Sequence, residues 1–150
     1  MEHIHGHQLC VLLADDDEDD RTFFREALDE LGIQTLLHTV TDGVQLLELV
    51  LRKESLLPDL IFLDLNMPGK NGKECLREIR AIPHLRDTPV IIFSTSANLR
   101  DIDETFHNGA SLYVQKPSGF TLMVELLDKV FRINWGDHIS KADRSKFYFS

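Results

Sequence analysis

The chain has 150 residues, of which 43% are hydrophobic and 27% charged, and its formal net charge is −9. This length suits a single domain with its own core, and the acidic balance argues against direct binding of nucleic acid, which needs clustered Lys and Arg. The apolar runs are much shorter than the roughly 20 residues of a membrane-spanning helix, and the N-terminus lacks a hydrophobic signal segment. We therefore expect a cytoplasmic protein that contacts neither nucleic acid nor membrane.

Residues 1–8 are predicted to form a flexible N-terminus without a function, although it carries alternating histidines at His3, His5 and His7. Cys10 and Cys75 have no metal-binding spacing, and in a cytosolic chain two such cysteines are more often small core residues than a disulfide.

The first apolar run, residues 9–14, predicts a buried strand, and six consecutive acidic residues follow it at 15–20. Apolar residues then recur at helical spacing, and Gly32 is expected to end this helix. The apolar positions are Phe24, Ala27, Leu28 and Leu31.

Residues 33–40 are predicted to form a shorter, more polar strand, suited to the edge of a sheet. A second helix is expected to begin at Asp42–Gly43 and to run to about Arg52. The apolar run 60–63 then predicts a buried strand that ends in Asp64, where Pro68, Gly69 and Gly72 make the chain turn.

The remaining pattern predicts a third helix after Gly72, a fourth strand at 89–93, a fourth helix ended by Asn108–Gly109, a fifth strand at 111–115, and a last helix over about 120–134. Strands that alternate with helices in this way predict an α/β fold, a doubly wound parallel sheet with helices on both faces. Residues 136–150 show no periodicity and are predicted to be a tail without an effector domain.

Polar residues follow four of these strands directly. Asp15 and Asp16 follow the first strand, Asp64 ends the third, Ser94 follows the fourth, and Lys116 follows the fifth. The carboxyl ends of parallel strands meet at one edge of the sheet, where reacting groups collect. Three carboxylates crowded there repel one another unless a cation joins them, and oxygen ligands of this kind suit Mg²⁺. The set is suited to holding a phosphoryl group at Asp64.

Four motifs together resemble the receiver domains of two-component response regulators, over residues 9 to about 134. They are Leu13-Ala14-Asp15-Asp16-Asp17, Leu63-Asp64-Leu65-Asn66-Met67-Pro68 with Gly72, Ser94, and Tyr113-Val114-Gln115-Lys116-Pro117. The pattern is similar to that of single-domain, chemotaxis-regulator-like receivers, and its acidic opening and Asn66-Met67-Pro68-Gly69 turn resemble receivers paired with phytochrome-type kinases. The resemblance implies a flavodoxin-like fold with five strands in the order 2-1-3-4-5, over residues 9–135.

The same resemblance implies a role for each site residue. Asp64 would accept a phosphoryl group from a sensor histidine kinase or a histidine phosphotransfer protein. The metal, Mg²⁺ with Mn²⁺ as a substitute, would be bound by Asp15, Asp16, Asp64 and the backbone carbonyl of Asn66. Lys116 and Ser94, which replaces the commoner Thr, would contact the phosphoryl oxygens, and the Lys116–Pro117 peptide would be cis.

The output implied by the resemblance is a switched protein-binding surface. Phosphorylation would draw Ser94 inward, Tyr113 would follow, and a downstream protein would detect the change. A receiver catalyses only its own phosphorylation and dephosphorylation, so we do not class it as an enzyme. The last helix carries surplus apolar residues, and the tail adds Phe147, Tyr148 and Phe149. They suggest a homodimer through this region, or a tail that folds back over its own helix.

Three other functions remain open. A phosphatase of the haloacid-dehalogenase type also uses Mg²⁺ and an Asp at a strand end, but it needs a second Asp where this chain has Asn66. Residues 15–26 partly match a calcium-binding EF-hand loop, although Asp20 stands where that loop needs Gly. A receiver-like protein that takes no phosphate could act as a binding module alone.

Overall fold

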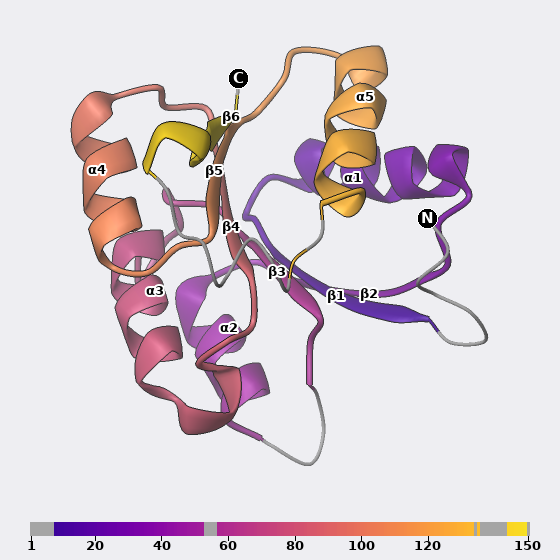
Figure 1. Cartoon of the computed structure of the whole chain (residues 1–150). Helices are drawn as coiled ribbons and strands as arrows, with labels where there is room; N and C mark the ends of the chain where they lie inside the picture. The colour runs from indigo at the N-terminus through magenta and orange to yellow at the C-terminus, as the bar shows by residue number, and fades with distance from the viewer. Residues whose placement is uncertain (1–7, 53–56, 134, 136–143, 150) are drawn as a thin grey trace.

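The computed structural model of the chain describes residues 8–52, 57–133, 135 and 144–149 (Figure 1). Predictions that concern His3, His5, His7 and residues 136–143 lie outside this part of the chain. The elements, in order, are β1 (Leu9–Ala14), α1 (Glu18–Leu31), β2 (Thr35–Val40), α2 (Gly43–Leu51), β3 (Leu60–Leu63), α3 (Gly72–Ala81), the 3-10 turn η1 (Pro83–Leu85), β4 (Val90–Ser94), α4 (Leu99–His107), β5 (Leu112–Gln115), α5 (Phe120–Phe131), the 3-10 turn η2 (Arg144–Lys146) and β6 (Tyr148–Phe149).

The strands form one sheet in the order β2-β1-β3-β4-β5-β6, and every neighbouring pair is parallel. The predicted flavodoxin-like order is therefore confirmed, and β2 lies at an edge as its more polar sequence indicated. The register places Ala14 of β1 beside both Val40 and Leu63. The first three strands thus end at nearly the same level.

The sixth strand corrects the prediction of a five-stranded sheet. Residues 144–149, part of the stretch predicted to be a tail without periodicity, form η2 and the two-residue strand β6 beside β5. Two residues are too few to show the alternation by which a strand is identified in a sequence. The pairing therefore depends on contacts with β5 and not on a local pattern.

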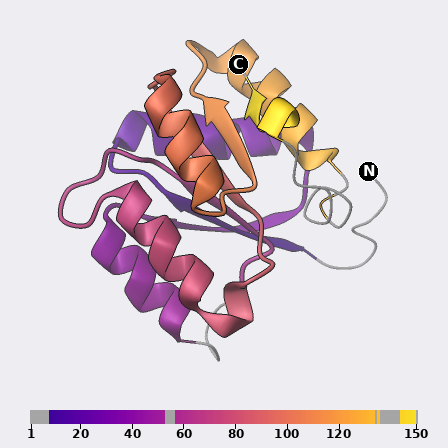
Figure 2. The same ribbon diagram turned by 60° about the vertical axis from the view of Figure 1, so that its left-hand side comes forward.

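Helices cover both faces of the sheet, as predicted (Figures 1 and 2). One face packs against α1 and α5 around Phe24, Phe62 and Phe93, whose rings meet edge to face. The other face packs against α2, α3 and α4. Cys75 is buried in this second layer and Cys10 is half-buried, and both are free thiols as expected. Within the described residues no helix is long and apolar enough to cross a membrane.

Short polar residues and glycines set the helix ends. The Asp17 side chain accepts hydrogen bonds from the N–H groups of Asp19 and Asp20 and so caps α1, which ends at Gly32 with a φ of 69°. That left-handed conformation favours glycine, because it has no Cβ. At α3, Asn71 and Glu74 form a reciprocal capping box.

Most of the surplus apolar residues near the last helix lie against the molecule's own core. Phe131 is buried and stacks on Phe62 with ring centroids 6.0 Å apart, while Ile133 and Trp135 are partly buried in the same layer. Leu122, in contrast, is 51% exposed. The apolar face that suggested a homodimer is thus mainly used inside one chain, and a dimer stays a prediction.

Candidate functional site

The carboxyl edge of the sheet brings the predicted site residues together through the strand ladder itself. The N–H of Asp64 donates to the carbonyl of Ala14 at 3.0 Å, and the N–H of Asp15 donates to that of Val40 at 3.1 Å. The N–H of Lys116 donates to the carbonyl of Ser94 at 2.8 Å. Each backbone is therefore fixed by a neighbouring strand, which holds the side chains over one point of the edge.

Three carboxylates meet at this point. Asp15, Asp16 and Asp64 each offer an oxygen atom, and these atoms lie within 4.8 Å of one another. Asp15 is fully buried, Asp64 is only 5% exposed, and Asp16 is open to solvent. The group therefore has one open side, from which a small ion or a phosphoryl donor can enter.

Lys116 supplies the positive charge that the sequence predicted. Its Nζ lies 2.9 Å from Oδ2 of Asp15 and 3.3 Å from Oδ2 of Asp64. It also lies 2.7 Å from Oδ2 of Asp20, which was not predicted to belong to the site. Asp20 could have been suspected from its place in the first turn of α1, one helical turn beyond the strand-end carboxylates. Four carboxylates with one ammonium leave the site with excess negative charge.

Burial and the ammonium of Lys116 act in opposite directions on the pKa values of the carboxylates. Burial raises the pKa of Asp15 to about 6, even though the N–H of Asp17 and the ammonium of Lys116 lower it. Burial also raises the pKa of Asp64, against the influence of Lys116 and the N–H of Asn66. Burial alone would lower the pKa of Lys116, but its hydrogen bonds with Asp20 and Asp15 hold that pKa above its usual value. A further cation at this site would favour the charged form of the carboxylates and so lower their pKa values.

The donor set fits a magnesium or manganese ion. Hard divalent cations of this size take carboxylate and carbonyl oxygens and retain several waters. Asp15 and Asp64 are nearly buried, and they share the ammonium of Lys116 with a third acid, Asp20. Their carboxylates therefore keep unused lone pairs and negative charge that Lys116 does not offset. Asn66 is exposed next to the group, and its N–H donates to Oδ1 of Asp64 at 3.2 Å, so its carbonyl belongs to the same turn.

Ser94, Ser96 and Tyr113 connect the site to α4. The buried Oγ of Ser94 accepts a hydrogen bond from the N–H of Ser96 at 3.1 Å, and the Oη of Tyr113 donates to the Ser96 carbonyl at 2.9 Å. The Oγ of Ser96 donates to Asp101 of α4 at 2.9 Å. Ser96, to which the sequence gave no role in this connection, therefore lies at its centre.

One predicted feature is wrong in this structure. The Lys116–Pro117 peptide is trans, and no cis peptide bond occurs in the described part of the chain. The cis and trans forms of a bond before proline differ by only about 0.5–1 kcal/mol, so proline permits the cis form without requiring it.

Comparison with known proteins identifies the family. Residues 11–128 match the response regulator receiver domain. The chain belongs to this family. It is 30% identical over 131 residues to the chemotaxis protein CheY-3 of Vibrio cholerae, covering 87% of this chain and 98% of that protein. It is 32% identical over 110 residues to the response regulator Rcp1 of Synechocystis, covering 71% and 75%.

Solved structures of receivers from light signalling are similar as well. The phosphorylated cyanobacterial phytochrome response regulator RcpA superposes with a TM-score of 0.77 at 29% identity, covering 82% of this chain and 91% of that one. The Mn²⁺-bound form of Rcp1 superposes with a TM-score of 0.75 at 28% identity, covering 81% and 91%. Receiver domains bind Mg²⁺ or Mn²⁺ at an acidic pocket, and the group of Asp15, Asp16 and Asp64 could hold an ion of this kind.

Two of the three alternatives from the sequence now lose support, and the receiver-like binding module that takes no phosphate stays an alternative. The match of residues 11–128 to the receiver family argues against a haloacid-dehalogenase-type phosphatase. The EF-hand alternative is wrong, because residues 18–31 form the continuous helix α1 where an irregular calcium loop would extend to Glu26. The chain is a receiver domain of two-component signalling, a class of signalling proteins.

Proposed function

We propose that Asp64 is the phosphoacceptor of this receiver. It is the nearly buried carboxylate that shares the ammonium of Lys116 with Asp15 and lies at the open carboxyl edge of the sheet. An Oδ atom of Asp64 attacks the phosphorus of a phosphohistidine, the P–N bond breaks, and its electron pair stays on the imidazole. The product is an acyl phosphate on Asp64 and a free histidine on the donor.

The surrounding residues position the group and offset its charge, which is most of what phosphoryl transfer requires. Lys116 neutralises one phosphoryl oxygen, and the hydroxyl of Ser94 donates to another. Asp15, Asp16, Asp64 and the carbonyl of Asn66 would hold Mg²⁺ or Mn²⁺, which would neutralise negative charge on the phosphoryl oxygens. Asp20 orients the Lys116 ammonium, since it makes the shortest of that group's contacts.

Receiver domains take phosphoryl groups from histidine kinases and pass the signal to downstream partners. For this chain the donor is a sensor histidine kinase or a histidine phosphotransfer protein in the cytoplasm. The similarity to RcpA, Rcp1 and a red-light response regulator of R. palustris favours a phytochrome-type kinase. The output is a protein-binding surface of α4, β5 and α5 that changes when Ser94 and Tyr113 move.

Intact-mass measurement tests the phosphoacceptor. The full chain is incubated with Mg²⁺ and acetyl phosphate, and we expect a gain of one phosphoryl group. Asp64→Asn should abolish the gain, because an amide oxygen is a poor nucleophile in a site of unchanged shape. Asp87→Asn is the matched control, since Asp87 is exposed and lies before β4, at the opposite edge of the sheet. Full phosphorylation of Asp64→Asn, or none of the unaltered chain, would contradict the proposal.

A further inference from the structure

The edge of β5 is occupied by the chain's own last strand. β6 pairs with β5 in parallel, with Tyr148 beside Tyr113 and Phe149 beside Val114. The N–H of Tyr113 donates to the carbonyl of Phe147 at 2.9 Å, and the Oη of Tyr148 donates to Oε1 of Gln115 at 3.0 Å. Residues 144–149, which we call the tail segment, thus accept a backbone hydrogen bond from β5 and donate to one of its side chains.

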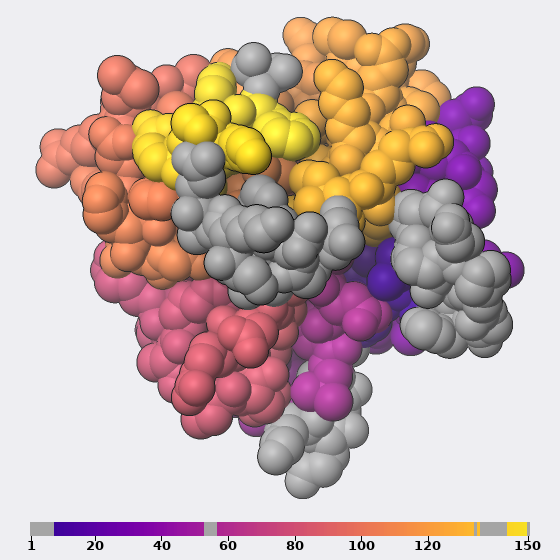
Figure 3. Space-filling view, in the orientation of Figure 1, coloured from indigo at the N-terminus to yellow at the C-terminus, as the bar shows by residue number. Residues whose placement is uncertain are grey.

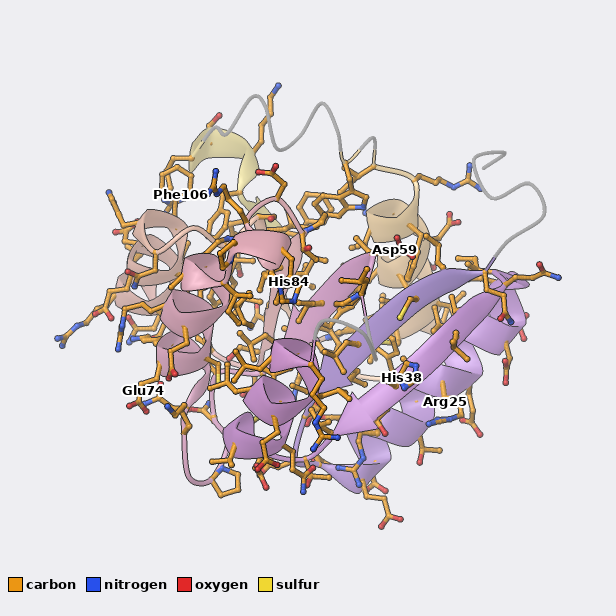
Figure 4. All side chains as sticks on the ribbon, turned by 90° about the horizontal axis from the view of Figure 1, so that it is seen from below. Arg25, His38, Asp59, Glu74, His84 and Phe106 are labelled. Atoms are coloured by element: carbon orange, nitrogen blue, oxygen red, sulfur yellow. The ribbon has the colours of Figure 1, made fainter. Side chains whose placement is uncertain are left out.

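The tail segment also contacts α4. Phe147 is only 2% exposed, and its ring meets that of Phe106 edge to face with centroids 5.2 Å apart. Arg144 forms an ion pair with Asp103 of α4 at 2.7 Å. Figure 4 shows Phe106 beside the tail segment, and in Figure 3 the same yellow residues lie between α4 and α5. The segment therefore covers the surface that the proposed function assigns to output.

The attachment is small in extent. Strand pairing comprises two residues, and one aromatic ring provides the buried anchor. Short strand pairs are marginally stable by themselves, whereas a free strand edge readily accepts an extended segment. The tail segment stays bound because the chain that joins it to α5 gives it a high local concentration. Such an occupant can be released by a modest loss of contacts.

Tyr113 couples the tail segment to the phosphorylation site. Its ring lies 6.3 Å from that of Phe147 and 5.9 Å from that of Tyr148, between centroids, while its hydroxyl donates to the Ser96 carbonyl. The N–H of Ser96 in turn donates to the hydroxyl oxygen of Ser94. If the Ser94 hydroxyl rotates toward a phosphoryl group on Asp64, its hydrogen bond with the Ser96 N–H breaks. The backbone at residues 94–96 then rearranges, and the Tyr113 hydroxyl loses the Ser96 carbonyl as its acceptor.

We propose that the tail segment is an internal, displaceable occupant of a strand-docking site on β5 and α4, and that phosphorylation of Asp64 releases it. The proposal rests on the proposed function and adds a regulatory step to it. While the segment is bound, the edge of β5 and the Phe147 pocket are closed to other proteins. When Tyr113 moves, Phe147 loses one wall of its pocket and the edge opens to an extended segment of a downstream protein.

Hydrogen exchange at the Tyr113 amide tests this directly, since that N–H donates to the Phe147 carbonyl. The full chain is measured by NMR with Mg²⁺, with and without acetyl phosphate, and intact mass gives the phosphorylated fraction. We expect phosphorylation to raise the Tyr113 exchange rate about tenfold or more. Amides in the centre of β1, which is remote from β6, should keep their rates.

Two variants separate docking from phosphorylation. Phe147→Ser empties the pocket and should raise the Tyr113 exchange rate in both states, so that phosphorylation changes it little. Arg144→Gln removes the half-exposed ion pair with Asp103, which lies outside the core. It should raise the Tyr113 exchange rate of the unphosphorylated protein, but by less than Phe147→Ser does. Arg132→Gln is its matched control, because Arg132, the residue after α5, pairs with Asp128 of that helix, and it should leave the rate unchanged. All three should gain the phosphoryl group as the unaltered chain does.

Other outcomes would overturn the release step, the proposed function or the assignment of β6 to the same chain. A phosphoryl gain with unchanged Tyr113 exchange overturns the release while the proposed function stands. Absence of any phosphoryl gain means that the proposed function has failed, and the release with it. Tyr113 protection that weakens on dilution would show that a second copy supplies the strand, which overturns the internal assignment.

Discussion

The Arg80 side chain, on α3, forms hydrogen bonds with two loops, one before β4 and one before β5. Its Nε donates to the Gly109 carbonyl at 2.7 Å, and its Nη1 donates to the carbonyls of Leu85 and Thr88 at 3.1 Å and 2.8 Å. Burial lowers the pKa of this guanidinium, although its interaction with Asp87 raises it. The side chain thus fixes the loops that precede β4 and β5.

Arg80→Met should lower the free energy of unfolding by about 2–3 kcal/mol, because the variant leaves partly buried carbonyls without a charged donor. Arg77→Met in the same helix is the control, and its exposed side chain should change stability by less than about 0.5 kcal/mol. Urea unfolding followed by circular dichroism measures both. Equal stabilities of the two variants would contradict the assigned role of Arg80.

Asp20 illustrates a limit of reading residues singly. Its contact with Lys116 joins positions 96 residues apart, and the run of six acids to which it belongs is also typical of a solvated helix start. The structure distinguishes Asp20, whose Oδ2 lies 2.7 Å from Nζ of Lys116, from Asp19, which is exposed. Asp15, Asp16, Asp64 and Lys116, in contrast, could be predicted because each follows a buried strand.

At the scale of elements, α3 packs closely against the loop that carries the proposed phosphoacceptor. A Cβ added at Gly72, the first residue of α3, would lie 2.4 Å from the carbonyl oxygen of Asp64 and 2.7 Å from Cα of Leu65. Both are backbone atoms, which cannot rotate away as a side chain could. Glycine is therefore required here for the approach of helix to strand, and not for turn geometry.

Gly72→Ala should displace the Asp64 backbone, lower stability by about 1–3 kcal/mol as overpacking does, and reduce the phosphoryl gain from acetyl phosphate several-fold. Gly32→Asn is the control, because an added Cβ there meets nothing within 4 Å and Asn tolerates its positive φ. Thermal unfolding and intact mass are the measurements. A Gly72→Ala protein with full stability and phosphorylation would refute the close contact.

At the scale of the whole molecule, the net charge of −9 is concentrated partly at the carboxyl edge of the sheet. Mutual repulsion among these acids opposes folding, and a divalent cation that binds only the folded chain removes it. Binding of this kind stabilises the folded state by mass action.

Mg²⁺ at about 100 times its dissociation constant should therefore raise the free energy of unfolding by about 2.7 kcal/mol. Asp16→Asn should remove most of this increment, whereas Asp19→Asn, in the same acidic run but outside the three-carboxylate group, should keep it. Urea unfolding with NaCl at equal ionic strength as the reference isolates the specific effect. Equal increments in all three proteins would place the ion elsewhere.

The sequence by itself determined the alternation of strands and helices and the family motifs at four strand ends. It could do so because apolar runs, helical periodicity and turn residues are local signals, and parallel strands place their carboxyl ends together. Only the tertiary structure decided that Phe131 and Trp135 turn inward, that Asp20 joins Lys116, and that Phe147 fills a pocket beside Tyr113. These depend on contacts between distant segments, whose energies no short stretch of sequence records.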